Sequence, residues 1–133
     1  MAIQYSVAVN NARLDAIEST TGTAPILRIF SGSQPANCAA ADSGTLLCSI
    51  TLPTDWMNAA SAASKTLLGT WSGTASAGSG ATPTHFRIWN SGATACHIQG
   101  TAGIGSGDLQ VNGTITSGQT VNVTAFTLNA ANT

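Results

Sequence analysis

The side chains able to do acid, base or metal chemistry are few in this chain and widely spaced. Among 133 residues there are four Lys or Arg and five Asp or Glu, so 7% of the residues are charged, against roughly 25% in an ordinary soluble domain. Acid–base catalysis of glycan cleavage needs two carboxyl groups in one cleft. Asp55 and Asp108 are the pair that such an enzyme would have to bring together.

The remaining acidic residues have simpler structural roles. Asp15 and Glu18 lie three residues apart in a helical pattern, close to Arg13, which is typical of a solvated helix flank. Asp42 and Asp108 stand beside Ser and Gly, where a carboxylate accepts hydrogen bonds from nearby backbone N–H groups in a turn. The sequence therefore predicts no catalytic residue and no enzyme.

Candidate metal ligands are also poorly grouped. Zinc needs three or four Cys, His or acidic ligands with recognisable spacing. Cys96 and His97 are neighbours, so an extended strand points them to opposite faces. His85 and His97 would share a site only if their strands paired, and no H-x-x-x-H or C-x-x-C motif accompanies them. We predict two half-exposed, hydrogen-bonded histidines and no metal.

Motifs for nucleophiles and phosphates are incomplete. Residues 69–73 read GTWSG, which misses the G-x-S-x-G elbow of serine hydrolases by one position. Residues 100–107 are rich in glycine, but this stretch has no Lys and leads into no predicted helix. A phosphate cradle needs helix-end N–H groups and usually a cation. The glycine-rich stretch therefore predicts a loop, and we expect no cofactor.

Composition limits the classes of partner that the protein can bind and the compartment in which it is made. The net charge is −1, so no basic field attracts nucleic acid, and no apolar run approaches the roughly 20 residues that span a bilayer. The start of the chain does not read as a secretory signal, which predicts synthesis in a cytoplasm. Cys38, Cys48 and Cys96 are then expected as buried or half-buried thiols, although one disulfide among these three remains open.

One segment is predicted to be helical. Val9, Ala12, Ala16 and Ile17 recur at steps of three and four, which predicts a helix over residues 7–18 that packs on its own sandwich or docks on a neighbour. Turn residues from Ser19 onward, Gly22 among them, are expected to end it. The stretch that begins at Pro53 is predicted to add one short helical turn.

The rest of the chain reads as short strands separated by turn residues. Residues 26–30 and 46–52 are strand-like, and residues 36–44 between them predict a long loop. Near the end, the parity of the apolar positions changes, which predicts a bulge near Ala125 or a strand that crosses between two sheets. We therefore predict an all-β fold in one domain over 1–133, an antiparallel sandwich or barrel with one N-terminal helix.

Four large side chains are candidates for an interface. Trp56 and Met57 lie in a predicted loop, and Arg87 and Trp89 share the strand face opposite to the apolar one. Tryptophan is enriched at interfaces, and an exposed Trp89 or Trp56 would also stack on the sugar rings of a host glycan. The alternative is that the tryptophans simply pack in the core or at its rim.

Several segments resemble a family of small structural proteins of tailed bacteriophages and prophages. They are residues 2–18, 35–45 (PANCAAADSGT), 52–57 (LPTDWM), 85–88 (HFRI), 96–101 (CHIQGT) and 118–128. The similarity of that family to capsid cement (decoration) proteins implies an antiparallel β-sandwich of jelly-roll type, bound outside an icosahedral shell. It implies no catalytic residue.

These observations lead to one expectation and three alternatives. We expect a structural virion protein on the capsid surface, made in the bacterial host cytoplasm, whose partners are the major capsid protein and copies of itself as a dimer or trimer. The same composition suits a neck, tail or fibre component. A host-glycan binding module and a glycan-processing enzyme are the alternatives from other classes.

Overall fold

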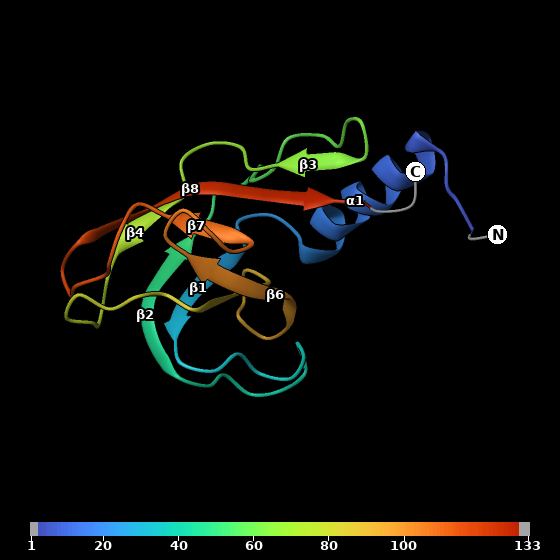
Figure 1. Cartoon of the computed structure of the whole chain (residues 1–133). Coiled ribbons are helices and arrows are strands. Elements are labelled where there is room, and N and C mark those ends of the chain that lie inside the picture. The colour runs from blue at the N-terminus through green and yellow to red at the C-terminus, as the bar shows by residue number, and fades with distance from the viewer. Residues whose placement is uncertain (1–2, 131–133) are drawn as a thin grey trace.

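The chain begins with one helix and continues as a series of short strands (Figure 1). The structure, a computed structural model, describes residues 3–130. The elements are α1 (Val7–Thr21), β1 (Ile26–Ser31), β2 (Thr45–Thr51), β3 (Ser64–Thr66), β4 (Ser72–Thr74), β5 (His85–Trp89), β6 (Cys96–Gly103), β7 (Leu109–Val111) and β8 (Thr120–Asn129).

Both ends of α1 have a clear chemical cause. Ser6 caps the start, where its hydroxyl accepts a hydrogen bond of 3.2 Å from the Val9 amide. Gly22 ends the helix with φ of 90°, a conformation that suits glycine, and its amide donates to the Glu18 carbonyl at 2.9 Å. The helix therefore runs one turn beyond the predicted end at residue 18. No helical turn forms after Pro53, where the chain makes bends and a single bridge at Met57.

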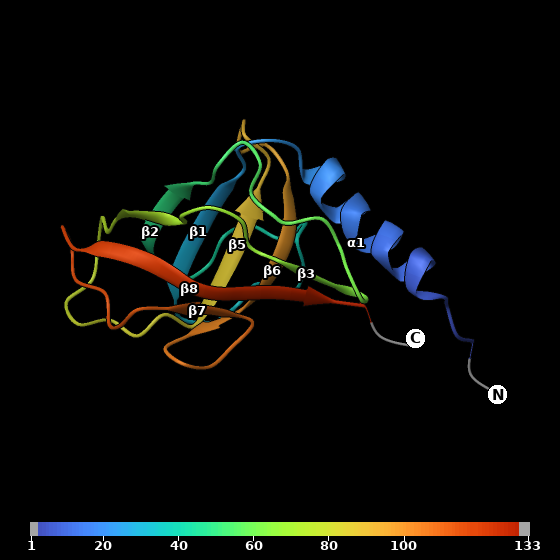
Figure 2. The same ribbon diagram turned by 90° about the horizontal axis from the view of Figure 1, so that it is seen from above.

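The strands form one curled, mixed sheet with the order β2-β1-β5-β6-β7-β8-β3, and β4 also pairs with β8 (Figure 2). The prediction of a mostly β fold with an N-terminal helix is confirmed. The prediction that all strands pair antiparallel is wrong for β6 and β7, which are parallel. The glycine-rich stretch between them loops back along β6, so that β7 starts beside the end of β6 and runs in the same direction. The predicted bulge near Ala125 is confirmed, since the β7–β8 register shifts between Gln110 and Val111.

The curl brings β4 over β2. An isolated bridge joins Cys48 to Ala75, and the Ser76 amide donates to the Leu47 carbonyl at 2.9 Å. A Cβ atom on Gly73 would lie 2.9 Å from Ile50 Cγ1, so only glycine lets β4 approach this closely. The two ends of the sheet thereby enclose the core.

Aromatic side chains fill the centre of this core. The Trp71 ring lies 5.9 Å from Trp56 and 5.4 Å from Phe126, and Phe126 meets Phe86 edge to face at 5.5 Å. Leu27, Ile29 and Ile88 from β1 and β5 line the inner face of the sheet. This placement of Phe86 and Ile88 confirms the predicted inner face of β5.

Candidate functional site

The buried lysine explains how α1 is attached to the sheet. Lys65 in β3 is 1% exposed, and its Nζ lies 2.8 Å from Asp15 Oδ1 and 2.7 Å from Glu18 Oε2. It also donates to the Asn58 carbonyl at 2.9 Å. The prediction that Asp15 and Glu18 form a solvated helix flank beside Arg13 is therefore wrong. They are the partners that a buried ammonium group requires.

Two further polar contacts hold the same face of the helix. The Ala60 amide donates to Asp15 Oδ1 and the Ala63 amide donates to Asn11 Oδ1, both at 2.9 Å. These amides belong to the segment 58–65, which runs alongside α1 (Figure 1). The helix is thus anchored mainly by its polar side chains.

This anchoring turns the apolar stripe of α1 outward. Val9, Ala12 and Ala16 from the apolar stripe are exposed, while Leu14 and the polar Asn10 are buried. The physical reason is that alanines offer little area for burial, whereas an unpaired Lys65 in the interior would be costly. The orientation of the helix follows the ion pairs.

The arm before the helix adds to this apolar surface. Ile3, Tyr5, Val7 and Val9 are 73%, 40%, 48% and 45% exposed, and they account for most of the large exposed apolar side chains of residues 3–130. Figure 2 shows this end of the chain projecting away from the strands. The four apolar residues Ile3, Tyr5, Val7 and Val9 are the sequence signal for this surface, and they lie outside the predicted interface residues.

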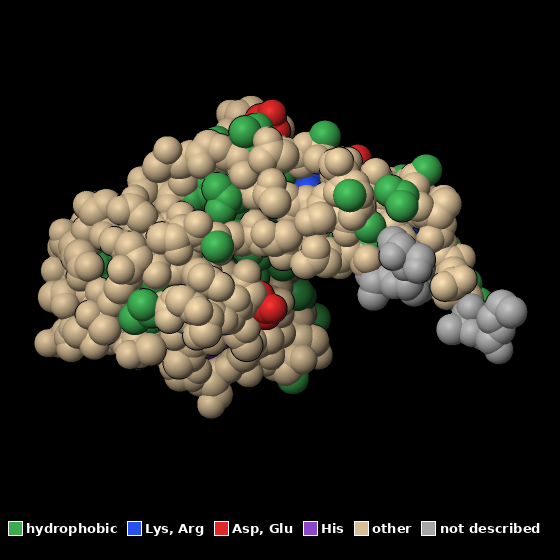
Figure 3. All heavy atoms as spheres, turned by 45° about the horizontal axis from the view of Figure 1, so that its top comes forward, with side chains coloured by type: hydrophobic (Ala, Val, Ile, Leu, Met, Phe, Trp, Pro, Cys, Tyr) green, Lys and Arg blue, Asp and Glu red, His purple; other side chains and the backbone are tan. Residues whose placement is uncertain are grey.

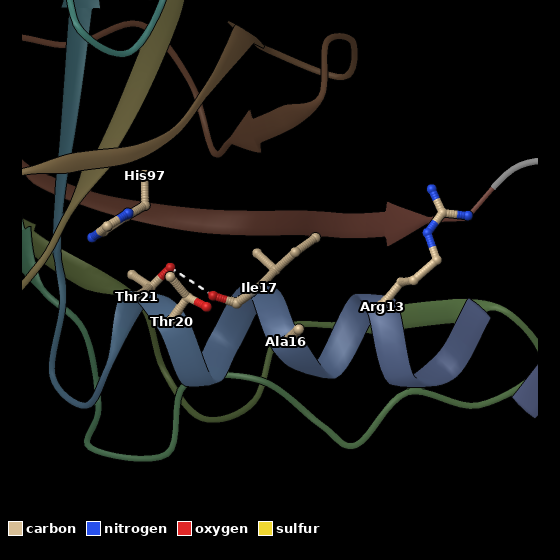
Figure 4. Close-up of a pocket in the computed structure, with 6 residues that line it drawn as sticks. All are labelled: Arg13, Ala16, Ile17, Thr20, Thr21 and His97. Atoms are coloured by element: carbon tan, nitrogen blue, oxygen red, sulfur yellow. Dashed lines mark hydrogen bonds between the residues drawn. The ribbon is translucent and has the colours of Figure 1, made fainter. Parts of the chain in front are cut away.

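A shallow pocket of about 290 Å³ lies between α1 and β6 (Figure 4). Arg13 and Ile17 project from the helix toward the side on which His97 hangs from β6. His97 is exposed and Ile17 is half-buried, so the pocket extends the apolar surface of α1 toward the sheet. Its lining carries no carboxylate.

A second buried cation lies on the outer face of β5. Arg87 is fully buried, and its Nη1 lies 2.6 Å from Asp42 Oδ1. Its Nη2 donates to the carbonyls of Cys38 and Ala40 at 2.9 Å and of Asn37 at 3.3 Å. Asp42 is therefore an ion-pair partner rather than a simple turn residue, and Arg87 holds the loop 32–44 against the sheet.

Three of the four predicted interface residues are buried within the chain. Trp56 and Met57 are 0% and 2% exposed, because the loop that contains them folds over the core and the Trp56 Nε1 donates to the Gly22 carbonyl at 3.0 Å. Arg87 is covered by the loop 32–44. The expected exposure is thus wrong for these three, and Trp89 alone is half-buried.

Trp89 is already engaged by its own chain. The Cζ atoms of Arg28 and Arg87 lie 5.0 Å and 5.1 Å from the centroid of its ring. Such cation–π contacts occupy the ring surface that a sugar would need for stacking. This arrangement disfavours the host-glycan reading of Trp89.

The candidates for catalysis and metal binding do not converge. Asp55 lines a pocket beside Asp15 and Glu18, whereas Asp108 accepts hydrogen bonds from the Thr101 amide at 3.0 Å and hydroxyl at 2.9 Å. The turn role predicted for Asp108 is thereby confirmed. No group of three or more His, Cys, Asp or Glu suited to a metal occurs among residues 3–130.

The two histidines also lie apart. His85 pairs with Thr101 across β5 and β6, and it is 1% exposed, so the predicted half-exposure is wrong for it. It stacks on Phe30 with the ring centroids 4.9 Å apart. Burial lowers the pKa of His85, which keeps the ring neutral at pH 7.

The exterior carries few charges: Arg13, Asp15, Asp42, Asp55 and Asp108 are exposed, and Glu18 and Arg28 are half-buried. Lys65 and Arg87 are inside, and their carboxylate partners are tied to them. Figure 3 shows a face dominated by uncharged atoms, with few red or blue side chains and scattered apolar ones. The arrangement can support packing against another surface by shape and apolar contact.

Comparison with protein-family models, with curated proteins and with solved structures found no match. Between residues 3 and 130, the structure contains no helix of the length and apolar character needed to cross a membrane.

The attachment of α1 is expected to weaken in acid. Hydrogen bonds from Lys65 and the Ala60 amide lower the pKa of Asp15 below its ordinary 3.8. A carboxylate with a depressed pKa stabilises the fold above its unfolded value and loses that contribution as the pH falls toward its folded value. Burial alone would lower the pKa of Lys65, but the hydrogen bonds to Asp15 and Glu18 raise it above its ordinary 10.5. The lysine contribution is therefore lost only at pH values beyond 10.5.

Thermal unfolding measured at steps from about pH 7 to pH 3 tests this window. The midpoint temperature of wild-type unfolding should decrease once the pH is lowered below about 4. Asp15→Asn should have a lower midpoint temperature at about pH 7 and should lose less of it as the pH is lowered. Parallel curves for the two proteins would contradict the assignment of Asp15 as the acid-sensitive partner.

Proposed function

We propose that this chain is a capsid cement (decoration) protein of a tailed bacteriophage, which binds the major capsid protein through α1 and the N-terminal arm. The observation that carries the proposal is the exposure of four large apolar side chains at one end of the chain, Ile3, Tyr5, Val7 and Val9. Groups of exposed apolar side chains mark interaction sites in soluble proteins. Because Lys65 holds the side of α1 that carries Asp15 and Glu18, Val9 on the other side is available to a partner.

The charge distribution supports the same role. Copies that cover a shell must sit close to one another, and like charges on their surfaces would oppose that packing. Here the side chains of Lys65 and Arg87 are used inside the fold, and the exterior is rich in Thr, Ser, Gly and Asn. Such a surface permits dense arrays at little electrostatic cost.

The mechanism would be mechanical. Each copy bridges neighbouring capsid subunits, and weak contacts repeated over a symmetric shell add up through effective concentration. A dimer or trimer at a symmetry axis fits the closed symmetry of most oligomers. The jelly-roll sandwich belongs to this proposal too, because it is the architecture that the resemblance to capsid cement proteins implies.

Binding to empty capsid shells of the phage that encodes the chain tests the proposal. Val9→Glu places a charge on the proposed surface, and Ile104→Glu is the matched control, because the two side chains are 45% and 42% exposed. Co-sedimentation should show at least about ten-fold weaker binding for Val9→Glu and wild-type binding for Ile104→Glu. Equal binding of both variants would contradict the assigned surface.

The location of the chain in intact particles separates cement from its structural alternative. Electron microscopy of the virion should find copies spread over the capsid faces. Copies confined to one vertex would instead identify a neck, tail or fibre component and would overturn the cement assignment.

A further inference from the structure

The three cysteines occupy two different environments. Cys48 is fully buried in the hydrophobic core, where no oxidant reaches it. Cys38 and Cys96 are half-buried, and both line one cavity of about 550 Å³ together with Trp89 and the alanines at 39–41. All three are free thiols in the structure. Only Cys38 and Cys96 are therefore placed to react with each other and with a small molecule from solvent.

Several contacts hold these two cysteines on the same face. Cys96 opens β6 and is the Cα partner of Trp89 in β5. Two residues before Trp89, Arg87 donates to the carbonyl of Cys38 itself at 2.9 Å. On the other side of Cys38, Gln99 Nε2 in β6 donates to the Pro35 carbonyl at 2.8 Å. The loop that carries Cys38 is thus bound both to β5 and to β6, and its position beside Cys96 is enforced.

We propose that Cys38 and Cys96 are an oxidative cross-linking site, which forms an intramolecular disulfide when the chain meets a small-molecule disulfide such as oxidised glutathione. The thiolate of one cysteine attacks the small disulfide and releases one small thiolate. The thiolate of the other cysteine then attacks the mixed disulfide, closes the Cys38–Cys96 bond and releases the second small thiol. The two cysteines lose two electrons and two protons, which the small disulfide gains.

The cross-link would fasten the loop 32–44 covalently to β6. Arg87 holds this loop only by hydrogen bonds and an ion pair, so the disulfide adds a bond that heat and denaturant do not break. The reducing cytosol keeps such thiols free, and an oxidising exterior permits the bond to form. The cross-link would therefore appear after the chain leaves the cell in which it is made. This inference does not depend on the partner of α1.

The local electrostatics set the rate of the reaction. Burial and the neighbouring Cys38 thiol raise the pKa of Cys96 to about 11, so this thiol is protonated at neutral pH. Because only the thiolate is a nucleophile, ring closure by Cys96 should be slow near pH 7 and accelerate as the pH rises toward 11.

The test treats the full-length chain with oxidised glutathione at alkaline pH and counts free thiols. The wild type and Cys48→Ala should each lose two thiols with no glutathione retained, and peptide mapping should find Cys38 joined to Cys96. Cys38→Ser and Cys96→Ser should form no intramolecular bond and should retain glutathione on the remaining half-buried cysteine. Two free thiols persisting at Cys38 and Cys96, or a bond that involves Cys48, would overturn the proposal.

Thermal unfolding gives an independent readout. Oxidation should raise the midpoint of the wild type by about 5–15 °C, as expected for a disulfide that closes a long loop, and a reductant should reverse the shift. Cys38→Ser should show no such shift. A disulfide that forms only between two chains, seen as a covalent dimer on a non-reducing gel, would also overturn the proposal.

Discussion

Replacing Arg87 with leucine is expected to lower the free energy of unfolding by about 3–5 kcal/mol, the range seen when one partner of a buried ion pair is removed. The guanidinium is fully buried and binds Asp42 together with three backbone carbonyls of the loop 32–44. Leucine retains the apolar volume of the side-chain stem but leaves those acceptors without a donor. The loop must then open to water.

Arg28→Leu is the matched control. Arg28 pairs with the same carboxylate at 3.1 Å and contacts the same Trp89 ring, but its side chain is 25% exposed and it makes no carbonyl contacts like those of Arg87. Ion pairs of this exposed kind contribute about 0–1 kcal/mol. Chemical denaturation followed by tryptophan fluorescence measures both variants. Similar losses for Arg28→Leu and Arg87→Leu would show that the carbonyl contacts contribute little.

Removing Trp56 should have a comparable effect, because this side chain is a core residue. Trp56→Ala is expected to lower the free energy of unfolding by about 3–5 kcal/mol, the usual result of deleting a buried aromatic side chain. The ring is fully buried against Trp71, and its Nε1 donates to the Gly22 carbonyl that follows α1. The variant therefore loses both packing and the link between the helix and the core.

Trp56→Phe separates these two contributions. Phenylalanine keeps an aromatic ring next to Trp71 but cannot donate to Gly22, so the loss should be smaller, mainly that of one hydrogen bond, about 1 kcal/mol, and of the smaller ring. Equilibrium denaturation in urea provides the comparison. If Trp56→Ala unfolded with the wild-type free energy, the residue would have to lie at the surface, as the sequence pattern suggested.

The local pattern of the chain predicted many elements well. Alternation and turn residues located β1 and β2, the parity change located the bulge near Ala125, and Gly22 marked the helix end to within one turn. These features depend on neighbours in sequence, so a linear reading finds them.

The candidate site was harder to predict, because each of its features depends on contacts between distant segments. No sequence motif surrounds Lys65, and its partner Asp15 lies 50 residues away in the chain. This contact nevertheless fixes the orientation of α1. A loop over residues 36–44 was expected, but the contact of the loop 32–44 with Arg87 was not. The burial of Trp56 also depends on distant segments, and the sequence of its loop did not predict it.

By itself, the sequence determined that this protein is rich in short strands, begins with a helix and has very few ionic groups, since composition and periodicity are properties of the chain alone. Only the tertiary structure decided where those ionic groups go. Lys65 and Arg87 are buried because each binds several oxygen atoms there, and an unpaired buried cation would be costly. Because the Lys65 contacts fix the orientation of α1, the apolar side of α1 and the residues from Ile3 to Val9 face outward.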